Sequence, residues 1–260
     1  MTRVAPKKAL GQHFLVDRNV LGVIERLAGL HADDVVLEVG PGLGVLTTFL
    51  ADRVAHVHAV ELDRSLDVPL RDALAGLGNV ALVFGDALTI DLAALDPTPG
   101  KLVSNLPYNI ATPLVVESLT SIAALAGWCV MVQREVADRF FAEPRTKAYG
   151  AVSVLVRLNA RRTGFHPVSR TVFRPPPNVD SALVAFERVP GPEHPDEVAR
   201  VVSGCFAHRR KTLANSLALS GVATREHAAE ALRGLGREPN VRAEALEPSE
   251  FVVLAERVLR

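Results

Sequence analysis

The sequence predicts an α/β fold, a mostly parallel seven-stranded sheet with helices on both faces, followed by a small C-terminal helical domain. Short β-like runs alternate with helix-like segments through the first two-thirds of the chain, which is typical of a parallel sheet. Glycine and proline then gather at Pro190-Gly191-Pro192 and Pro195, a composition typical of a linker. We therefore expect one domain over residues 1–189 and a second over residues 190–260.

Apolar, β-branched runs mark the expected strands. Five of them are candidates for the parallel sheet: Val35–Val39, His56–Val60, Val80–Phe84, Leu102–Ser104 and Trp128–Val132. The segments between them have room for helices, and Val20–Leu27 shows helical spacing of its apolar residues. Two later runs, Val152–Leu158 and Ala182–Phe186, resemble further strands that can pair as an antiparallel edge. Beyond residue 190 the chain reads as short helices broken by glycine and proline.

Composition favours a soluble enzyme of a reducing compartment. Hydrophobic residues make up 48% of the 260 and charged residues 22%, which is ordinary for a globular protein. The two cysteines, Cys129 and Cys205, have no metal-type spacing, so we expect a cytoplasmic protein with neither disulfides nor a metal site. The amino terminus lacks an apolar signal segment, and polar residues interrupt the longest apolar stretch, Val115–Val132. We predict no membrane span.

The distribution of charge is more informative than its sum. Basic and acidic residues balance at 29 each, whereas a protein that binds RNA is more often basic. Nine basic residues but only three acidic ones lie between Arg134 and Arg174, and a second basic run follows at His208-Arg209-Arg210-Lys211. Such clusters are suited to a polyanion. Charge alone leaves a solvated face without a partner equally open.

A glycine-rich turn and two acids predict a site for an adenosine-containing ligand. Val35–Val39 runs into Gly40-Pro41-Gly42-Leu43-Gly44, and a helix-like segment follows. Glycines let the backbone approach a ligand closely. The next strand ends at Glu61, which can accept hydrogen bonds from ribose hydroxyls, and the one after ends at Asp86, which can accept from an adenine amine. In an open α/β sheet these strand ends share one edge. The alternative is a tight turn with ordinary surface acids.

The fourth strand ends in Asn105-Leu106-Pro107-Tyr108, a sequence suited to methylating an amine. The amine of adenine is a poor nucleophile because its lone pair is delocalised into the ring. Acceptors aimed at its N–H groups, here the Asn105 side-chain oxygen and the Leu106 carbonyl, would stabilise the positive charge that develops on attack. Pro107 fixes the turn, and Tyr108 offers a face on which a flipped base can stack. The alternative is a Pro-Tyr turn without chemistry.

With these motifs the sequence resembles the ribosomal RNA adenine N6,N6-dimethyltransferases, and most of all their bacterial 16S branch. The motifs that carry the resemblance span nearly the whole chain: Lys8–Leu15, Leu37–Gly44, Val60–Asp63, Gly85–Ala87, Asn105–Asn109, Met131–Val136, Ala148–Gly150, Phe173–Ser181, Arg209–Leu213 and Arg242–Glu244. Each motif alone is modest evidence for the resemblance. Their occurrence together in this order along the chain is strong evidence.

The resemblance implies a Rossmann-like class I methyltransferase that uses S-adenosylmethionine. The residues implied to contact that cofactor are His13, Leu15, Gly40, Gly42, Glu61, Asp86 and Asn105. His13 stands where many family members have asparagine. Phe173 is implied as a second aromatic flank for the target adenine, although it could equally belong to the core.

The resemblance also implies the substrate. Both methyl groups would go onto each of two adjacent adenines in a hairpin near the 3′ end of 16S rRNA, in a precursor of the small ribosomal subunit. The C-terminal helices would help to grip the RNA, with Arg209, Arg210 and Lys211 acting on RNA affinity. We expect a monomer, since nothing in the sequence suggests an obligate dimer.

Three other functions remain as alternatives. One is a 23S rRNA adenine N6-methylase of the erythromycin-resistance type, although Leu106, Asn109 and Phe173 favour the 16S branch. Another is a ribosome-assembly or transcription factor on the same fold, against which the intact cofactor motifs argue. An NAD-dependent dehydrogenase is remote, because no residues for hydride transfer accompany the glycines and the spacing is G-x-G-x-G.

Overall fold

The computed structural model describes Lys7 and residues 12–259. Residues 8–11, which begin the first motif of the resemblance, lie outside the described part. The chain divides into two compact units. The first contains residues 1–137 and 161–188, and the second contains residues 138–160 and 189–260.

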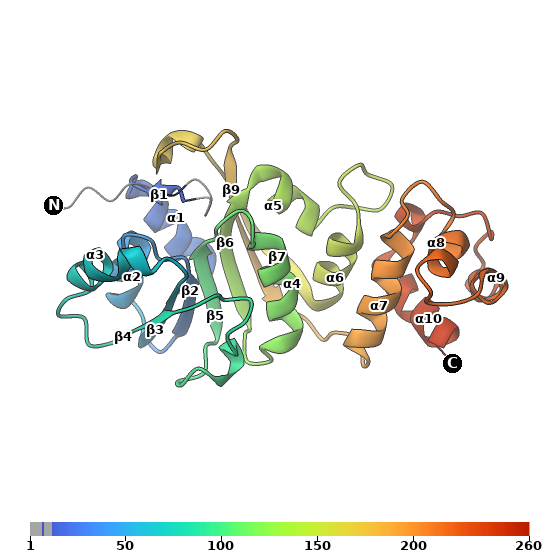
Figure 1. Ribbon diagram of the computed structural model, residues 1–260, viewed down its shortest axis with the longest axis horizontal. Coiled ribbons are helices and arrows are strands. Elements are labelled where there is room, and N and C mark those ends of the chain that lie inside the picture. The colour runs from blue at the N-terminus through green and yellow to red at the C-terminus, as the bar shows by residue number, and fades with distance from the viewer. Residues whose placement is uncertain (1–6, 8–11, 260) are drawn as a thin grey trace. The chain divides into compact units, whose positions relative to one another are not determined.

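The first unit is built on a seven-stranded sheet with the strand order β4-β3-β2-β5-β6-β9-β7 (Figure 1). The strands of this sheet are β2 (Val35–Val39), β3 (His56–Glu61), β4 (Val80–Phe84), β5 (Lys101–Asn105), β6 (Gly127–Gln133), β7 (Ala160–Val168) and β9 (Ser181–Arg188). β2 pairs in parallel with β3 and β5, and the parallel pairs β3–β4 and β5–β6 extend the sheet on either side. β9 pairs antiparallel with β6. The predicted mostly parallel sheet is confirmed.

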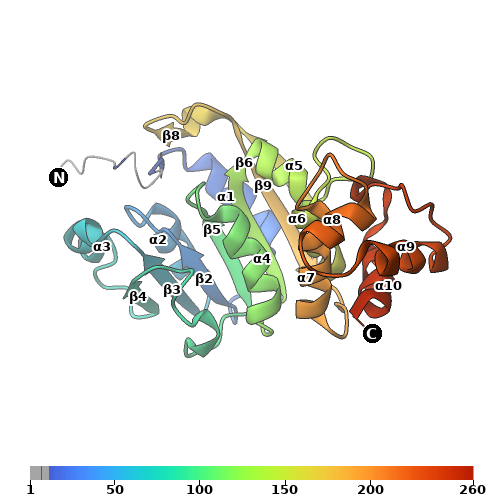
Figure 2. The same cartoon turned by 45° about the vertical axis from the view of Figure 1, so that its right-hand side comes forward.

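Helices cover both faces of this sheet. They are α1 (Asn19–Ala28), α2 (Val45–Ala51), α3 (Asp67–Ala73) and α4 (Ala111–Ser121), and α5 (Arg134–Phe140) follows β6. The adjacent residues Trp128 and Cys129 of β6 point to opposite faces, as successive strand residues must. Trp128 Nε1 donates to Ser118 Oγ of α4 at 2.9 Å, whereas the Cys129 thiol approaches the Ile24 carbonyl of α1 at 4.0 Å. α1 and α4 therefore lie on opposite sides of β6, and α4 stands in front of the central strands in Figure 2.

The strand order puts the predicted site residues at one edge of the sheet. β2, β3, β4 and β5 are parallel, so their carboxyl ends meet there. The chain leaves β2 toward β3 on one side and returns to β5 on the other, which makes the β2–β5 boundary the switch point where ligands bind in such sheets. A small second sheet joins β1 (Phe14–Leu15) to β8 (Phe173–Arg174), with Leu15 opposite Phe173.

The second unit is helical. Its helices are α6 (Ala151–Asn159), α7 (Pro195–Phe206), α8 (Leu213–Leu219), α9 (Arg225–Gly234) and α10 (Pro248–Leu259), the last four drawn from orange to red in Figure 1. Their apolar faces share one buried core that includes Val201, Leu217 and Phe251. Tyr149 is fully buried in the same core, and its hydroxyl donates to the Leu246 carbonyl at 2.8 Å.

Two expectations about this region differ from the structure. The segment Val152–Leu158 is helix α6 and not a strand, so the expected antiparallel edge with Ala182–Phe186 is wrong. The Ser153 hydroxyl accepts the Gly150 N–H at 3.2 Å at the start of this helix. Val154 is buried in the core of the second unit, and Leu155 and Leu158 pack against that core. The seventh strand is β7, whose exposed Arg161 and Arg162 hide the alternation that marks a strand.

The compact units also differ from the expected domains. Residues 138–160 belong to the second unit, although the expected boundary near residue 190 assigned them to the first domain. The reason is tertiary, because α6 packs its apolar side chains into the helical core while β7, directly after it, joins the sheet. The segment rich in glycine and proline at Pro190 lies where the chain passes from one unit to the other for the last time. It gives no indication of the two earlier passages, after residues 137 and 160.

Among the described residues, no helix combines the length and the apolar character needed to span a membrane. The described residues also contain no group of three or more side chains arranged to hold a metal ion. Both cysteines are buried and free, and burial raises the pKa of the Cys129 thiol to about 12.

Candidate active site

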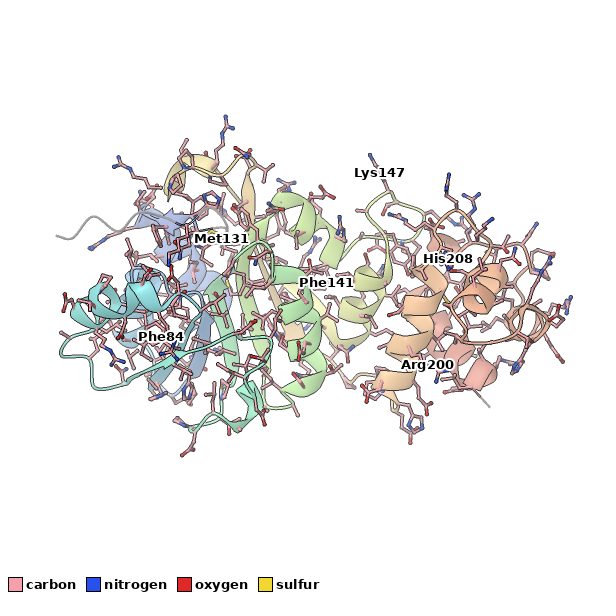
Figure 3. All side chains as sticks on the ribbon, in the orientation of Figure 1. Phe84, Met131, Phe141, Lys147, Arg200 and His208 are labelled. Carbon is pink, nitrogen blue, oxygen red and sulfur yellow. The ribbon has the colours of Figure 1, made fainter. Side chains whose placement is uncertain are left out.

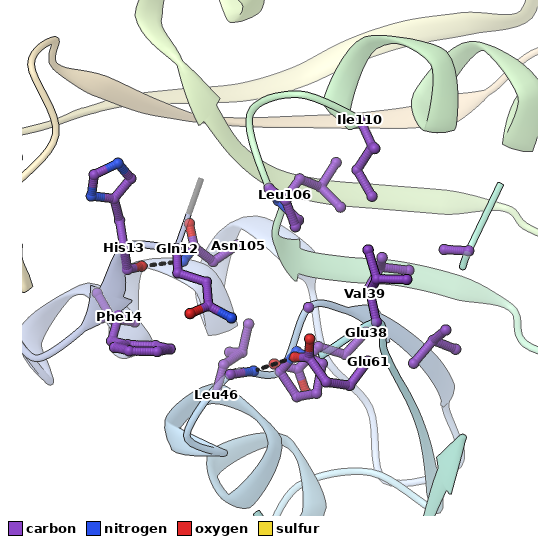
Figure 4. Close-up of a pocket in the computed structure, with 18 of the residues that line it drawn as sticks. Gln12, His13, Phe14, Glu38, Val39, Leu46, Glu61, Asn105, Leu106 and Ile110 are labelled. Carbon is purple, nitrogen blue, oxygen red and sulfur yellow. Dashed lines mark hydrogen bonds between the residues drawn. The ribbon is translucent and has the colours of Figure 1, made fainter. Parts of the chain in front are cut away.

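A pocket at the carboxyl edge of the sheet collects most of the predicted site residues (Figure 4). The predicted residues that line it are His13, Leu15, Gly40, Gly42, Glu61, Asp86, Asn105, Leu106, Pro107 and Tyr108. They come from β1, from the turn after β2, and from the ends of β3, β4 and β5. Segments as distant as residues 13 and 108 thus meet in one cavity.

The glycine-rich turn lines the pocket with backbone. Gly40 has φ +76°, and a Cβ there would lie 3.0 Å from the Pro107 ring. Gly42 has φ +59°, and a Cβ there would lie 3.0 Å from the ring of Phe14. Any larger residue would be strained by its backbone conformation and would push the turn that contains Pro107, or β1, outward. Glycine is therefore required at both positions for the pocket to keep its shape.

Glu61 is held firmly at the end of β3. Its carboxylate accepts the Gly42 N–H at 3.1 Å and the Asp63 N–H at 2.8 Å, and only 6% of the residue is exposed. Burial raises its pKa, while the hydrogen bonds from Asp63 and Gly42 oppose that rise. The side chain is thereby fixed at the pocket wall, where it can accept hydrogen bonds from a ligand.

Glu38 is a pocket residue that the sequence reasoning missed. It lines the cavity, it is 1% exposed, and its Oε2 has no hydrogen-bond partner among the described residues. Burial raises its pKa to about 8, opposed by a contact with Thr47 and reinforced by the charge of Glu61. An acid inside an apolar strand directly before a glycine turn is the signal that could have identified it, because a carboxyl is rarely buried without a purpose.

The turn after β5 holds the residues that the sequence predicted as hydrogen-bond acceptors for the target amine. Asn105 Nδ2 donates to the His13 carbonyl at 3.3 Å, which leaves the side-chain oxygen of Asn105 for other donors. The Leu106 N–H donates to the Met131 carbonyl at 3.1 Å, and Leu106 is buried. The Pro107 carbonyl accepts the Ile110 N–H at 3.1 Å and closes the turn.

Tyr108 and Asp86 complete the wall of the pocket. The Tyr108 hydroxyl shares a hydrogen bond of 2.6 Å with Ser181 Oγ, and burial raises the pKa of the Tyr108 phenol. Asp86 Oδ1 accepts the Leu88 N–H at 3.0 Å, so its carboxylate is oriented by its own turn. Both side chains border the cavity.

Phe173 is placed differently from the aromatic flank that the resemblance implied. It is 2% exposed, pairs with Leu15 between β8 and β1, and belongs to the core of the first unit. It does not belong to the described lining of the pocket. This placement matches the alternative of a core residue that the sequence left open.

A second residue that the sequence did not single out anchors the segment before β1. Asp63 accepts from Lys7 Nζ at 2.7 Å, from Gln12 Nε2 at 2.9 Å and from Ser65 Oγ at 2.7 Å. Burial alone would raise its pKa, but the hydrogen bonds from Lys7, Ser65 and Gln12 lower it well below its ordinary value. Since Asp63 also donates its N–H to Glu61, this anchor is joined directly to the pocket wall.

The predicted RNA-binding residues lie in the second unit and have different surroundings. Arg209 donates to the carbonyls of Lys147 and Tyr149, at 3.3 Å each, and approaches the Glu244 carboxylate at 3.7 Å. Figure 3 labels Lys147 and His208 in the two segments that Arg209 joins. Arg210 and Lys211 are exposed. Arg209 therefore has a structural role that its two neighbours lack within the described part of the chain.

The basic stretch from Arg134 to Arg174 is divided between the two units. Several of its members are already engaged: Arg157 pairs with Glu143 at 2.9 Å, Arg161 pairs with Glu187, and Arg134 lies over the Phe165 ring. The stretch is thus not one free basic surface within a single unit.

Comparison with known proteins identifies the family to which the chain is similar. The model of the family "Ribosomal RNA adenine dimethylase" matches residues 4–256. The chain is 48% identical to ribosomal RNA small subunit methyltransferase A of Rubrobacter xylanophilus over 97% of this chain and 95% of the relative. It is 43% identical to the protein of that name from Pelotomaculum thermopropionicum, covering 98% and 92%.

Solved structures show the same fold. A dimethyladenosine transferase from Plasmodium falciparum has a TM-score of 0.79 at 24% identity, covering 93% of this chain and 96% of its own. The 23S rRNA methyltransferase ErmE has a TM-score of 0.67 at 29% identity, covering 95% and 100%. The sheet is therefore that of a Rossmann-like class I methyltransferase. With a family model and close relatives that span almost its entire length, the chain belongs to the ribosomal RNA adenine dimethylase family.

Proposed function

We propose that this enzyme uses S-adenosylmethionine to dimethylate the exocyclic N6 of two adjacent adenosines in a hairpin near the 3′ end of 16S rRNA. The observation that carries the proposal is the meeting of Asn105 and Tyr108 with the glycine turn and Glu61 in one pocket. Relatives that are named small subunit methyltransferases, with 43% and 48% identity, support the 16S substrate.

Several features of the pocket support S-adenosylmethionine as its ligand. Gly40 and Gly42 let the backbone pack closely at the pocket, where a Cβ would press on Pro107 or Phe14. The buried Oε2 of Glu38 has no partner among the described residues and offers a polar atom to a ligand. We assign Glu61 to the ribose hydroxyls of the cofactor and Asp86 to its adenine amine. The rest of the pocket wall would be formed by Leu15 and by the backbone around His13 and Asn105. When bound, the cofactor supplies an electrophilic methyl group on its sulfonium.

The chain's own residues would prepare the target amine. The Asn105 Oδ1 and the Leu106 carbonyl accept its two N–H groups, which favours a tetrahedral nitrogen and stabilises the charge that develops there. Pro107 keeps these acceptors in one turn, and Tyr108 offers its ring to the flipped base. No strong general base is needed, because the methylated ammonium loses its proton readily. The work of the protein is thus positioning and electrostatics.

We assign the RNA grip to the helical second unit, where Arg210 and Lys211 are exposed. With equal numbers of basic and acidic residues, affinity would come from this local charge and from the assembling small-subunit particle. We propose that the enzyme acts as a cytoplasmic monomer on that precursor.

The decisive experiment is methyl transfer from labelled S-adenosylmethionine to unmethylated small-subunit particles, with large-subunit RNA in parallel, followed by nucleoside analysis. We expect N6,N6-dimethyladenosine from the small-subunit substrate alone. Label in large-subunit RNA alone would instead favour the 23S methylase, an alternative that the likeness to ErmE keeps in view. Cofactor binding without label in either RNA would mean that the assigned substrate is wrong.

A further inference from the structure

The imidazole of His13 is engaged outside the cofactor side of the pocket. In Figure 4 it points away from Glu61 and Leu46. Its Nδ1 lies 2.7 Å from the Pro175 carbonyl oxygen, and because a carbonyl can only accept, Nδ1 carries the proton. What His13 gives to the pocket is its backbone, whose carbonyl accepts Asn105 Nδ2 at 3.3 Å.

The same imidazole packs beside Tyr108. The two ring centroids are 5.6 Å apart and the planes are inclined by 32°, which is within the range of favourable offset aromatic contacts. The distance is too short for a base to lie between the rings, because stacked rings need about 3.5 Å on each side. His13 therefore packs against Tyr108, and both residues line the pocket.

The hydrogen bond of the Tyr108 hydroxyl does not by itself fix the plane of the ring. Its hydroxyl is tied to Ser181 Oγ at 2.6 Å, and Ser181 is buried at the start of β9, opposite Gln133 of β6. A hydrogen bond at the hydroxyl fixes the long axis of the ring, but it does not prevent rotation about that axis. A neighbouring ring that is itself anchored supplies the missing restraint, and the hydrogen bond from His13 to Pro175 provides that anchor.

We infer that His13 is a positioning residue for the target base, because its imidazole sets the plane of the Tyr108 ring on which that base stacks. This inference rests on the proposed function of Tyr108. Phe173 is buried in the core and is not part of the described lining of the pocket. The orientation of Tyr108 then matters more than it would in a two-sided aromatic clamp.

Two variants separate the ring contact from the hydrogen bond. His13→Ala removes both, whereas His13→Phe keeps an aromatic ring beside Tyr108 and removes the bond to Pro175. With His13→Ala we expect kcat on small-subunit particles to fall about tenfold or more, since small misplacements of reacting groups are costly. The KM for the particle and the calorimetric Kd for S-adenosylmethionine should stay within about twofold. His13→Phe should recover most of kcat.

Other results would overturn the inference. A Kd for S-adenosylmethionine that rises in step with the loss of kcat would make the His13 side chain a cofactor contact. Unchanged kcat in His13→Ala would remove any positioning role. If His13→Phe were as slow as His13→Ala, the ring contact would not be what matters.

A second measurement does not depend on the RNA substrate. The chain has only two tyrosines, Tyr108 and Tyr149, so ring-labelled tyrosine gives two resonances that are easily assigned by NMR. His13→Ala should shift the Tyr108 ring resonance and leave that of Tyr149, which lies in the other unit, unchanged. If wild-type enzyme left small-subunit particles unmethylated, the proposed function would fail. The inference about the His13–Tyr108 contact would fail separately if the Tyr108 resonance did not move.

Discussion

At the scale of single residues, the pocket depends on polar groups that folding removes from water. Glu38 and Glu61 are both buried in its wall. Glu61 accepts a backbone hydrogen bond on each carboxylate oxygen, whereas Oε2 of Glu38 has no partner among the described residues. An isolated buried carboxylate costs stability unless it is neutral or paired. The site is therefore built at the expense of the stability of the ligand-free protein.

Asn105 offers the most direct test at this scale. Asn105→Ala removes the proposed acceptor for the adenine amine, and we expect kcat to fall by at least about 100-fold, as when one preorganised polar group is removed from an active site. Asn105→Asp retains an oxygen acceptor but not the Nδ2 donor to His13, so it should keep more activity than the alanine variant. Labelled methyl transfer with matched circular dichroism spectra checks both. Wild-type turnover in Asn105→Ala would exclude the proposed role.

Glu38 predicts a specific dependence of stability on pH. Folding raises its pKa from 4.5 to about 8, so between these values the unfolded chain ionises while the folded protein stays protonated. The unfolded state then binds fewer protons, and this residue makes the free energy of unfolding fall as the pH rises through that window. Glu38→Gln removes the effect, and it should stabilise the protein by roughly 4 kcal/mol near pH 8 but by less than about 1 kcal/mol near pH 5.

The measurement is urea unfolding followed by the fluorescence of Trp128, the single tryptophan, which lies in β6 of the same unit. Glu117→Gln, an exposed position of α4, is the matched control and should leave the pH dependence unchanged. If the free energy of unfolding changed equally with pH in wild type and in Glu38→Gln, Glu38 would be ionised in the folded protein.

At the scale of elements, the site is a junction of turns. The glycine turn after β2 touches the Asn-Leu-Pro-Tyr turn after β5 where Gly40 faces Pro107. The Gly40 N–H also donates to the Val60 carbonyl of β3 at 2.8 Å. The turn proposed to bind the cofactor and the turn proposed to position the base are thus in close contact.

Gly40→Ala tests this junction. Its φ of +76° disfavours an alanine, and the added Cβ would press on Pro107. We expect a loss of stability of about 1–2 kcal/mol, the usual cost of a left-handed backbone with a side chain. Cofactor affinity and methyl transfer should decrease together. Thermal unfolding and calorimetry measure these effects. Gly78→Ala, where a Cβ meets nothing within 4 Å, should be nearly neutral, and an equal loss there would refute the argument.

At the scale of the whole molecule, chemistry and RNA grip are assigned to different units. The pocket belongs to the first unit, while Arg209, Arg210 and Lys211 belong to the helical second unit. Since net charge is zero, we expect the salt dependence of RNA binding to report on a few local cations.

Substitutions of the three basic residues should have different effects, because the surroundings of Arg209 differ from those of Arg210 and Lys211. Replacing Arg210 and Lys211 together by alanine should weaken RNA binding and reduce the salt slope by about 1–2, because each neutralised phosphate contributes roughly 0.7–0.9 to that slope. The melting temperature of this double variant should not change. Arg209→Ala should also lower the stability of the second unit, because it removes bonds to the Lys147 and Tyr149 carbonyls. Filter binding across a salt series, with thermal unfolding, measures both effects.

Arg200→Ala is the control for both measurements, since Arg200 is exposed on α7 of the same unit. It should leave the salt slope and the melting temperature near their wild-type values. A salt slope that the Arg210 and Lys211 double variant left unchanged would remove these two residues from the RNA footprint.

The local sequence pattern was sufficient to predict the structure of segments whose conformation depends mainly on their own residues. The five parallel strands, the glycine turn and the Asn-Leu-Pro-Tyr turn are each short, periodic or conformationally special, so their residues predicted both their structure and their shared edge of the sheet. Because the strands are parallel, Glu61, Asp86 and Asn105 had to meet. The sequence by itself thus determined the fold class, the pocket and the family.

Tertiary structure decided what depends on partners distant in the chain. Alternating valines in residues 152–158 fit a strand, but burial in the helical core and the Ser153 hydroxyl at its start make that segment α6. Phe173 became a core residue because β8 pairs with β1. The free oxygen of Glu38, the bond from His13 to Pro175 and the role of Arg209 likewise arise from contacts between segments. Local sequence cannot report such contacts, because burial and hydrogen bonding are properties of the assembled fold.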